Sequence, residues 1–211
     1  MSRTPGKKAE RRAPAQRAAE IAAAAQQLAL EGGLSSVTLR GVAARAGVAA
    51  ALVAHYEPNM DALVAETFAA VVHAEIDAVS ALIAADATAD IRLAHLLDTL
   101  LDGSRTGVTV VWVDAWTLGR RNDALAARVR AEMDAWQAVI RGIVEAGVAA
   151  GEFETDDAAS VSWQILGMID GLNAQALVRW GEATDRSVLL AHAVEGMLRL
   201  PRGSLAVLPV S

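Results

Sequence analysis

The chain has 211 residues, of which 54% are hydrophobic, and a formal net charge of -6 at pH 7. This length suits one medium domain, or a small module joined to a larger one, and the apolar share is ample for a buried core. The lack of cysteine excludes disulfides and cysteine-ligated metal sites and, with no recognisable signal peptide, favours the cytoplasm. The longest uncharged stretch, residues 158–169, is shorter than the ~18 to 20 residues of a membrane span, so no membrane partner is expected.

Positive charge is concentrated at the N-terminal end. Residues 1–55 carry eight Lys and Arg against three Glu, a net charge of +5, so the remaining 156 residues carry -11. Such asymmetry indicates a basic DNA-facing segment joined to an acidic body. Residues 1–13 combine Pro, Gly and charge without apolar periodicity, which predicts a disordered basic arm. Its candidate DNA-binding residues are Arg3, Lys7, Lys8, Arg11 and Arg12.

Apolar periodicity predicts helices along the rest of the chain. Alternation of period two is nowhere sustained, so we expect an all-α fold of about nine helices. Pro14 suits the first turn of a helix that reaches Leu30, and the Gly32-Gly33 pair is a typical helix stop. Further helices are expected at residues 39–46, 49–56, from Asp61 to about 83, 91–102, 108–120, 123–150, 157–181 and 186–200.

Residues 38–56 have the pattern of a helix-turn-helix. Its two closely crossing helices need a small residue in the first helix, a residue tolerant of positive φ at the turn, and apolar anchors for the second helix. Ala43, Gly47, Val48 and Val53 meet these needs in order. Thr38 is the expected N-cap of the first helix. The first helix would then lie over the DNA backbone while the second enters the major groove.

The predicted reading helix offers few polar groups to DNA. Arg40 and Arg45 on the first helix, and His55 and Tyr56 at the end of the second, are expected to bind phosphates. Alanine methyl groups contact thymine methyls with weak discrimination, so we expect an A·T-tolerant operator read mainly by shape, arm and a few charges. The candidate DNA-contacting residues are Thr38, Arg40, Arg45, Ala49, Ala50, Ala51, Ala54, His55 and Tyr56.

This stretch resembles the TetR family of bacterial transcriptional regulators. The matching residues are Thr38, Val42-Ala43, Ala46-Gly47-Val48, Tyr56, Asn59-Met60 and Leu63. Residues 107–153 and 165–178 are similar to the ligand-binding region of the branch that includes the choline-responsive betaine regulator, so the resemblance covers about residues 14–200. The sequence departs from the family's usual polar or larger residues at Ala49, Ala51, Ala54, Glu57 and Met60. These departures favour weak or relaxed operator recognition.

The resemblance implies a helix-turn-helix DNA-binding domain over residues 14–58, a ligand-binding and dimerisation domain over 59–200, and a tail over 201–211. It further implies a homodimer on double-stranded operator DNA, because two reading helices must meet successive major-groove faces about 34 to 36 Å apart or a multiple of that. Members of the family are usually repressors. A small-molecule effector would favour a body conformation that misfits the operator, with the helix that starts at Asp61 carrying the motion.

Four of the five tryptophans lie where the resemblance places the walls of a ligand cavity. Trp112 and Trp116 share one helix face. With nearby acidic residues they would suit a cationic effector, whereas the alternative is that they are ordinary core residues and that the effector is apolar. The candidate ligand-binding residues are Trp112, Asp114, Trp116, Met133, Trp136, Trp163, Met168, Asp170 and Asn173. No metal or cofactor is expected.

The family's last two long helices pack against their twins as a four-helix bundle, which implies a dimer interface within residues 157–200. Gly167 and Gly171 lie four residues apart and would allow close backbone approach, either to the partner or within the chain. The candidate interface residues are Leu166, Gly167, Ile169, Gly171, Asn173, Ala176, Leu177, Trp180, Leu189, Ala193 and Met197.

Catalytic motifs are lacking. No lysine follows Lys8, there is no GxGxxG, GxSxG or HExxH sequence, and the four histidines are scattered, so no enzyme is predicted. Three alternatives stay open: a packed helical hairpin at residues 38–56, a TetR-like dimer with weakened or lost DNA binding that acts as a ligand-binding or adaptor protein, and a helical-bundle enzyme.

Overall fold

The computed structural model describes residues 13–85, 88–181 and 183–205. Within these ranges it contains nine α-helices, one 3-10 turn and no strand, which confirms the predicted all-α fold. The helices are α1 (Pro14–Gly32), α2 (Leu39–Ala46), α3 (Ala50–Tyr56), α4 (Met60–Ile83), α5 (Ala89–Leu101), α6 (Thr106–Gly119), α7 (Asp123–Ala150), α8 (Ala158–Leu177) and α9 (Ala183–Met197), and the 3-10 turn η1 (Leu34–Ser36) follows α1. The predicted arm, with Arg3, Lys7, Lys8, Arg11 and Arg12, lies outside the described residues.

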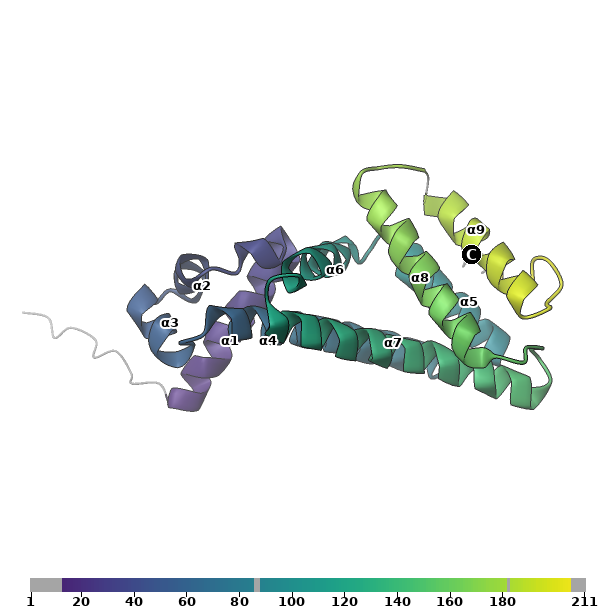
Figure 1. The fold of residues 1–211 in the computed structure, drawn as a ribbon, viewed down its shortest axis with the longest axis horizontal. Helices are drawn as coiled ribbons and strands as arrows, with labels where there is room; N and C mark the ends of the chain where they lie inside the picture. Colours follow the sequence, from purple (N-terminus) through teal and green to yellow (C-terminus); the bar gives the residue numbers. More distant parts are fainter. Residues whose placement is uncertain (1–12, 86–87, 182, 206–211) are drawn as a thin grey trace, which may run out of the picture.

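The helices form an elongated molecule with two distinct ends (Figure 1). Helices α1 to α3 make one end, and α5, α8 and α9 make the other. The long helices α4 and α7 pack along each other and join the two ends, while α6 lies between the α1–α3 end and α8. None of the described helices is long and apolar enough to cross a membrane.

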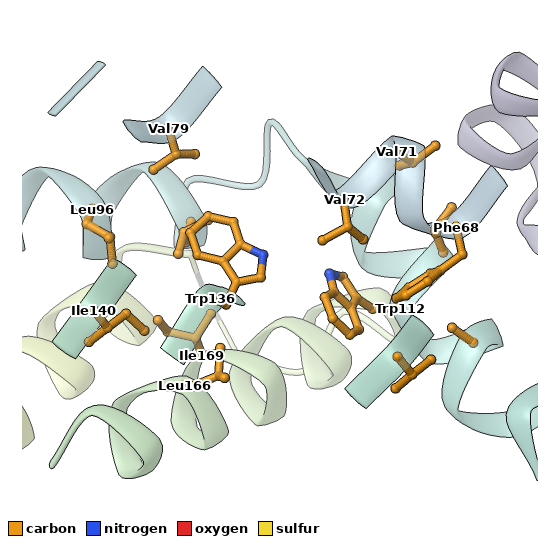
Figure 2. Close-up of a cluster of buried hydrophobic side chains, with 14 of the residues drawn as sticks. Phe68, Val71, Val72, Val79, Leu96, Trp112, Trp136, Ile140, Leu166 and Ile169 are labelled. Atoms are coloured by element: carbon orange, nitrogen blue, oxygen red, sulfur yellow. The ribbon is translucent and has the colours of Figure 1, made fainter. Parts of the chain in front are cut away.

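One buried apolar core runs through the body. Figure 2 shows its central part, in which side chains from α4, α5, α6, α7 and α8 meet. Phe68 and Trp112 pack edge to face, with ring centroids 4.9 Å apart. Helix α4 contributes an apolar stripe to this core, buried at Leu63, Phe68, Val71, Val72, Val79 and Ile83 and only partly buried at Ile76.

The bounds of the last two helices differ from the prediction. Helix α8 ends at Leu177 rather than at residue 181, and α9 begins at Ala183 and ends at Met197. The chain leaves α8 through Arg179, which has φ 59°, and the backbone N–H of Arg179 donates to the carbonyl of Ala176 at 2.9 Å. A left-handed residue after a helix is usually Gly or Asn, so a stop at an arginine two residues before Gly181 was not predicted.

Candidate functional site

The helix-turn-helix forms as the residues predict. Thr38 caps α2, because its hydroxyl oxygen accepts a hydrogen bond from the backbone N–H of Gly41 at 3.1 Å. Gly47 adopts the left-handed conformation with φ 65°, and the N–H of Val48 donates to the carbonyl of Ala43 at 2.9 Å. Val53 is fully buried and anchors α3 to the core. This geometry leaves the opposite face of α3 free for DNA.

The free face of α3 is lined by methyl groups. Ala49, Ala51, Ala54 and His55 are exposed, whereas Tyr56 is partly buried against the core. The ring of His55 meets that of Tyr56 edge to face at 5.4 Å. Ala49 occupies the N-cap of α3 and makes no side-chain cap, since alanine has no acceptor. The surface can therefore supply phosphate contacts from the end of α3 and methyl contacts from its middle.

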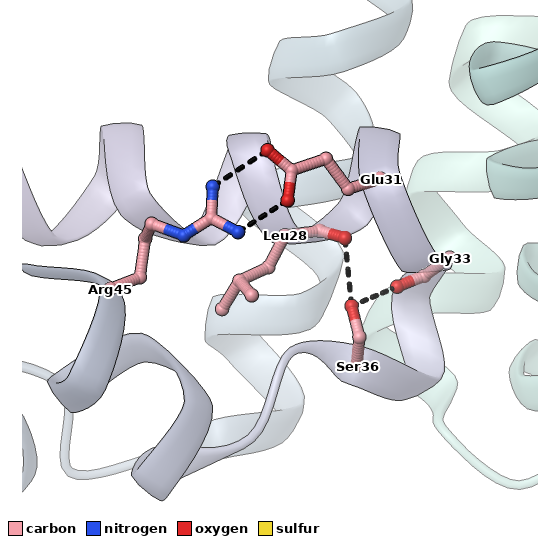
Figure 3. Close-up of polar contacts among 5 residues, drawn as sticks. All are labelled: Leu28, Glu31, Gly33, Ser36 and Arg45. Atoms are coloured by element: carbon pink, nitrogen blue, oxygen red, sulfur yellow. Dashed lines mark hydrogen bonds and ion pairs between the residues drawn. The ribbon is translucent and has the colours of Figure 1, made fainter.

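Arg45, which the sequence predicts to bind phosphate, is exposed and is paired with a carboxylate of the same protein. Its guanidinium makes a bidentate ion pair with the Glu31 carboxylate, with one N–O distance of 2.7 Å (Figure 3). This contact ties the end of α1 to α2, and the Arg45 guanidinium holds the pKa of Glu31 below its usual range. The Ser36 hydroxyl reinforces the same corner by donating to the carbonyl of Leu28 at 2.8 Å. Arg40 is exposed on α2.

Helix α6 contacts the DNA-binding end directly. The Asp114 carboxylate accepts hydrogen bonds from the backbone N–H and the hydroxyl of Ser35, at 3.2 and 3.4 Å. At Gly107 an added Cβ would lie 2.7 Å from the carbonyl oxygen of Leu30. Asp114 thus belongs to the junction between the two ends and not to the ligand cavity, because it points from α6 towards η1. This contact adds a second mechanical connection to the one predicted through α4.

A partly open cavity lies among α4, α5, α6, α7 and α8, in the region where the sequence predicts the ligand site. It has a volume of about 40 Å³, room for only a few water molecules. Four predicted ligand residues line it, namely Trp112, Trp136, Asp170 and Asn173. Figure 2 shows Trp112 and Trp136 on opposite sides of this region, with the indole nitrogens on the ring edges that face each other. The remaining lining residues are Glu75, Leu100, Arg105, Val108, Thr109, Leu166 and Ile169.

Two acidic side chains give the cavity its electrostatic character. Burial raises the pKa of Glu75 to about 7; the Arg105 guanidinium opposes this rise and the Asp170 carboxylate adds to it. Burial also raises the pKa of Asp170 to about 6. The Arg105 Nη1 atom lies 3.9 Å from Oε1 of Glu75. With both carboxylates ionised the cavity has one negative charge in excess, and an incoming cation would stabilise that ionised form.

Glu75 and Arg105 were not predicted from the sequence to lie in the ligand site. Glu75 did carry a signal, because it falls on the apolar stripe of α4 at the spacing of Phe68, Val72 and Val79. A charged residue at a core position is expected to be paired or functional, and here 8% of Glu75 is exposed. Arg105 precedes α6 in a polar joint, and only the packing of that joint against α8 brings it to the cavity.

Four other predicted ligand residues lie away from this cavity. Trp163 is 66% exposed and, with Met133, lines a separate surface depression between α7 and α8. Trp116 packs beside Trp112 with ring centroids 5.7 Å apart, and Met168 packs against the core, but neither lines the cavity. The prediction that Trp163 walls the cavity is wrong, because the rotation of α8 turns that side chain outward.

The outer faces of α8 and α9 carry most of the predicted dimer residues. Gly167 and Gly171 are exposed, and a Cβ added at either would meet nothing within 4 Å, so these glycines do not serve packing within the chain. Leu189 is 62% exposed and Ala193 is also exposed. Asn173, Ala176, Leu177 and Met197 are partly buried, and Trp180 is exposed in the loop after α8. The prediction that Leu166 and Ile169 lie in the dimer interface is wrong, because both are buried in the protomer's own core and line the cavity.

A helix-turn-helix at one end and a charged cavity within the helical body are the features of a ligand-responsive transcriptional regulator. The sequence model of the tetR family of bacterial regulatory proteins matches residues 21–67, and that of the C-terminal domain of BetI-type transcriptional repressors matches residues 89–199. The chain therefore belongs to the TetR family of transcriptional regulators. No curated protein sequence gives a match to the chain.

Solved structures share this fold. A transcriptional regulator from Saccharomonospora viridis in complex with choline is 23% identical, with a TM-score of 0.76 over 86% of this chain and 96% of that one. A TetR-family regulator from Rhodococcus sp. is 17% identical, with a TM-score of 0.75 over 87% and 99%. FadR of Bacillus subtilis in complex with stearoyl-CoA is 20% identical, with a TM-score of 0.63 over 85% and 97%. At these identities the likeness concerns the fold.

Proposed function

We propose that this regulator is a repressor that leaves its operator when a small organic cation binds between Trp112, Trp136, Glu75 and Asp170. The observation that carries the proposal is the pair of buried carboxylates beside two indoles. Aromatic rings and carboxylates together favour a cation over a neutral apolar molecule. The choline-bound regulator from Saccharomonospora viridis is consistent with this ligand class.

The small size of the cavity suggests how ligand binding would release DNA. A ligand larger than a few water molecules can enter only if the surrounding helices shift. Helix α6 carries Trp112 in the cavity wall and Asp114 in the contact with Ser35, two residues apart. Movement of α6 on ligand binding would therefore change the position of the DNA-binding end and favour a conformation that misfits the operator.

Release of DNA by a cation tests this proposal. In a gel shift with the DNA upstream of the protein's own gene, choline is expected to lower the affinity by roughly 5- to 150-fold, the usual range of allosteric coupling. The matched control is 3,3-dimethylbutan-1-ol, in which carbon replaces the charged nitrogen. Equal release by both compounds would contradict the cationic effector. A failure to shift any DNA would support the alternative of a regulator-like dimer without a DNA role.

We also propose that the outer faces of α8 and α9 form a homodimer interface. Two exposed glycines allow the backbones to approach closely, and Leu189 and Trp163 present exposed apolar side chains on the same two helices. Burial of such side chains is the main favourable term in association. Trp163 is therefore assigned to the interface instead of the cavity.

A charge placed on this face is expected to separate the protomers. Leu189→Asp should change the mass measured by light scattering after size-exclusion chromatography from that of a dimer to that of a monomer of 22.0 kDa. Leu82→Asp is the matched control, because Leu82 is 55% exposed on α4 and lies on neither helix of the proposed interface. A Leu189→Asp protein that remains dimeric at micromolar concentration would place the interface elsewhere.

A further inference from the structure

A second cavity adjoins the effector cavity at the N-terminal end of α6. Its volume is about 120 Å³, and it shares Leu100, Arg105, Thr109 and Asn173 with the first cavity as a common wall. Beyond that wall it is lined by Gly103, Thr106, Ala176, Leu177 and Arg186. Whereas the first cavity holds two carboxylates, the residues that line the second include two guanidinium groups and no acidic side chain.

Arg186 is a buried arginine whose guanidinium is only partly hydrogen-bonded. It is only 9% exposed, and its Nη1 donates to the carbonyl of Gly181 at 3.0 Å. Among the described residues, none accepts a hydrogen bond from its buried Nε atom. The Nε atom of Arg105, which also lines this cavity, is buried and unbonded in the same way. Buried guanidinium donors without acceptors are expensive, and an anion placed between them would satisfy both.

The first turn of α6 adds positive potential at the same place. Arg105 occupies the N-cap of α6 and makes no side-chain cap, so the first backbone N–H groups of the helix keep their partial positive charge. Thr106 and Thr109, both in the cavity lining, lie in this turn. Anions bind favourably at such a helix end, and here the two arginines give the site its charge.

We propose that the effector is a zwitterion, with its cationic group between Glu75 and Asp170 and its anionic group between Arg105 and Arg186. The two adjoining cavities together hold two carboxylates and two guanidiniums, a balance that suits a neutral molecule with separated charges. Arg105 stands in the shared wall, 3.9 Å from Glu75. The inference rests on the proposed cationic site and adds the second pole of the ligand.

Calorimetric titration of the full-length protein with matched compounds tests the proposal. The probes are trimethylammonio-acetate and 4-(trimethylammonio)butanoate, which carry both charges at two spacings, and their methyl esters, which keep only the cation. At least one zwitterion is expected to bind ten-fold or more tightly than its ester. Arg186→Gln should remove this preference while the affinity for the ester is unchanged, and Arg186→Lys should keep part of it.

The outcomes separate the two proposals. If both esters bind at least as tightly as their zwitterions, the anionic subsite is wrong and the cationic effector stands. If no trimethylammonium compound binds, both proposals fall. If Arg186→Gln loses affinity for the ester as well, thermal unfolding shows whether that variant is folded. A folded variant that does not bind the ester contradicts the separation of the two subsites. If the variant is unfolded, the anionic subsite is judged from Arg186→Lys and from the preference of the wild type for the zwitterion.

Discussion

Gly33→Ala is expected to lower the free energy of unfolding by about 2 to 4 kcal/mol, from backbone strain together with overpacking. Gly33 follows α1 with φ 77° and ψ 172°, a conformation that is open essentially only to glycine. An added Cβ would lie 2.4 Å from an Asp114 carboxylate oxygen and 3.1 Å from a methyl carbon of Val110. Urea unfolding followed by circular dichroism measures the loss.

A second glycine provides the control. Gly142 lies within α7, where a Cβ would meet nothing within 4 Å, so Gly142→Ala is expected to stabilise the protein by roughly 0.5 to 1 kcal/mol. Opposite signs for the two variants would show that strain and the contact with α6 matter, and not the loss of glycine itself. A Gly33→Ala protein as stable as the wild type would mean that the junction yields easily, which would weaken the proposed mechanical connection from α6 to the DNA-binding end.

The stability of the ligand-free protein is expected to fall as the pH rises from 5 to 8. Burial raises the pKa of Glu75 from 4.5 to about 7, so the folded state holds a proton that the unfolded chain has released across this window. The stabilisation is complete below pH 4.5 and is lost as the pH passes through 7, which amounts to roughly 2 kcal/mol between pH 5 and 8. Asp170, whose pKa rises from 3.8 to about 6, acts in the same direction at lower pH.

Chemical denaturation at pH 5, 6, 7 and 8 measures this slope. Glu75→Gln should flatten it, because glutamine stays neutral throughout, whereas Asp77→Asn, on an exposed side of the same helix, should leave it unchanged. A cation such as choline should bind more tightly as the pH rises through 6 and 7, since it favours the ionised carboxylates. Equal slopes in the wild type and Glu75→Gln would show that Glu75 is ionised at all these pH values.

Local sequence was sufficient for the DNA-binding end. The cap at Thr38, the left-handed turn at Gly47 and the buried anchor Val53 involve residues within a few positions of each other, so their roles follow from helix and turn geometry. The pairing of Arg45 was not predictable in this way. Its partner Glu31 lies fourteen residues away on another helix, and only the crossing of α1 over α2 brings the two together.

The lining of the proposed effector cavity was predicted only in part. Trp112, Trp136, Asp170 and Asn173 line it as the resemblance implied, but Glu75 and Arg105 were not expected there. Helix α8 has apolar residues on several faces, and each residue turns the helix by about 100°, so the sequence did not show which face would be buried. Trp163 and Ile169 were therefore placed on the wrong sides of α8.

The sequence by itself determined the all-α class, the helix-turn-helix and the family, because helix periodicity, capping residues and turn glycines act over short distances. Tertiary structure alone brought Glu75 and Arg105 to the cavity and turned Trp163 towards solvent. The raised pKa values of Glu75 on α4 and Asp170 on α8 follow from burial in the region where α4 packs with α6, α7 and α8, and only the fold brings these two carboxylates together. Desolvation depends on that assembled environment, and no local pattern of residues encodes it.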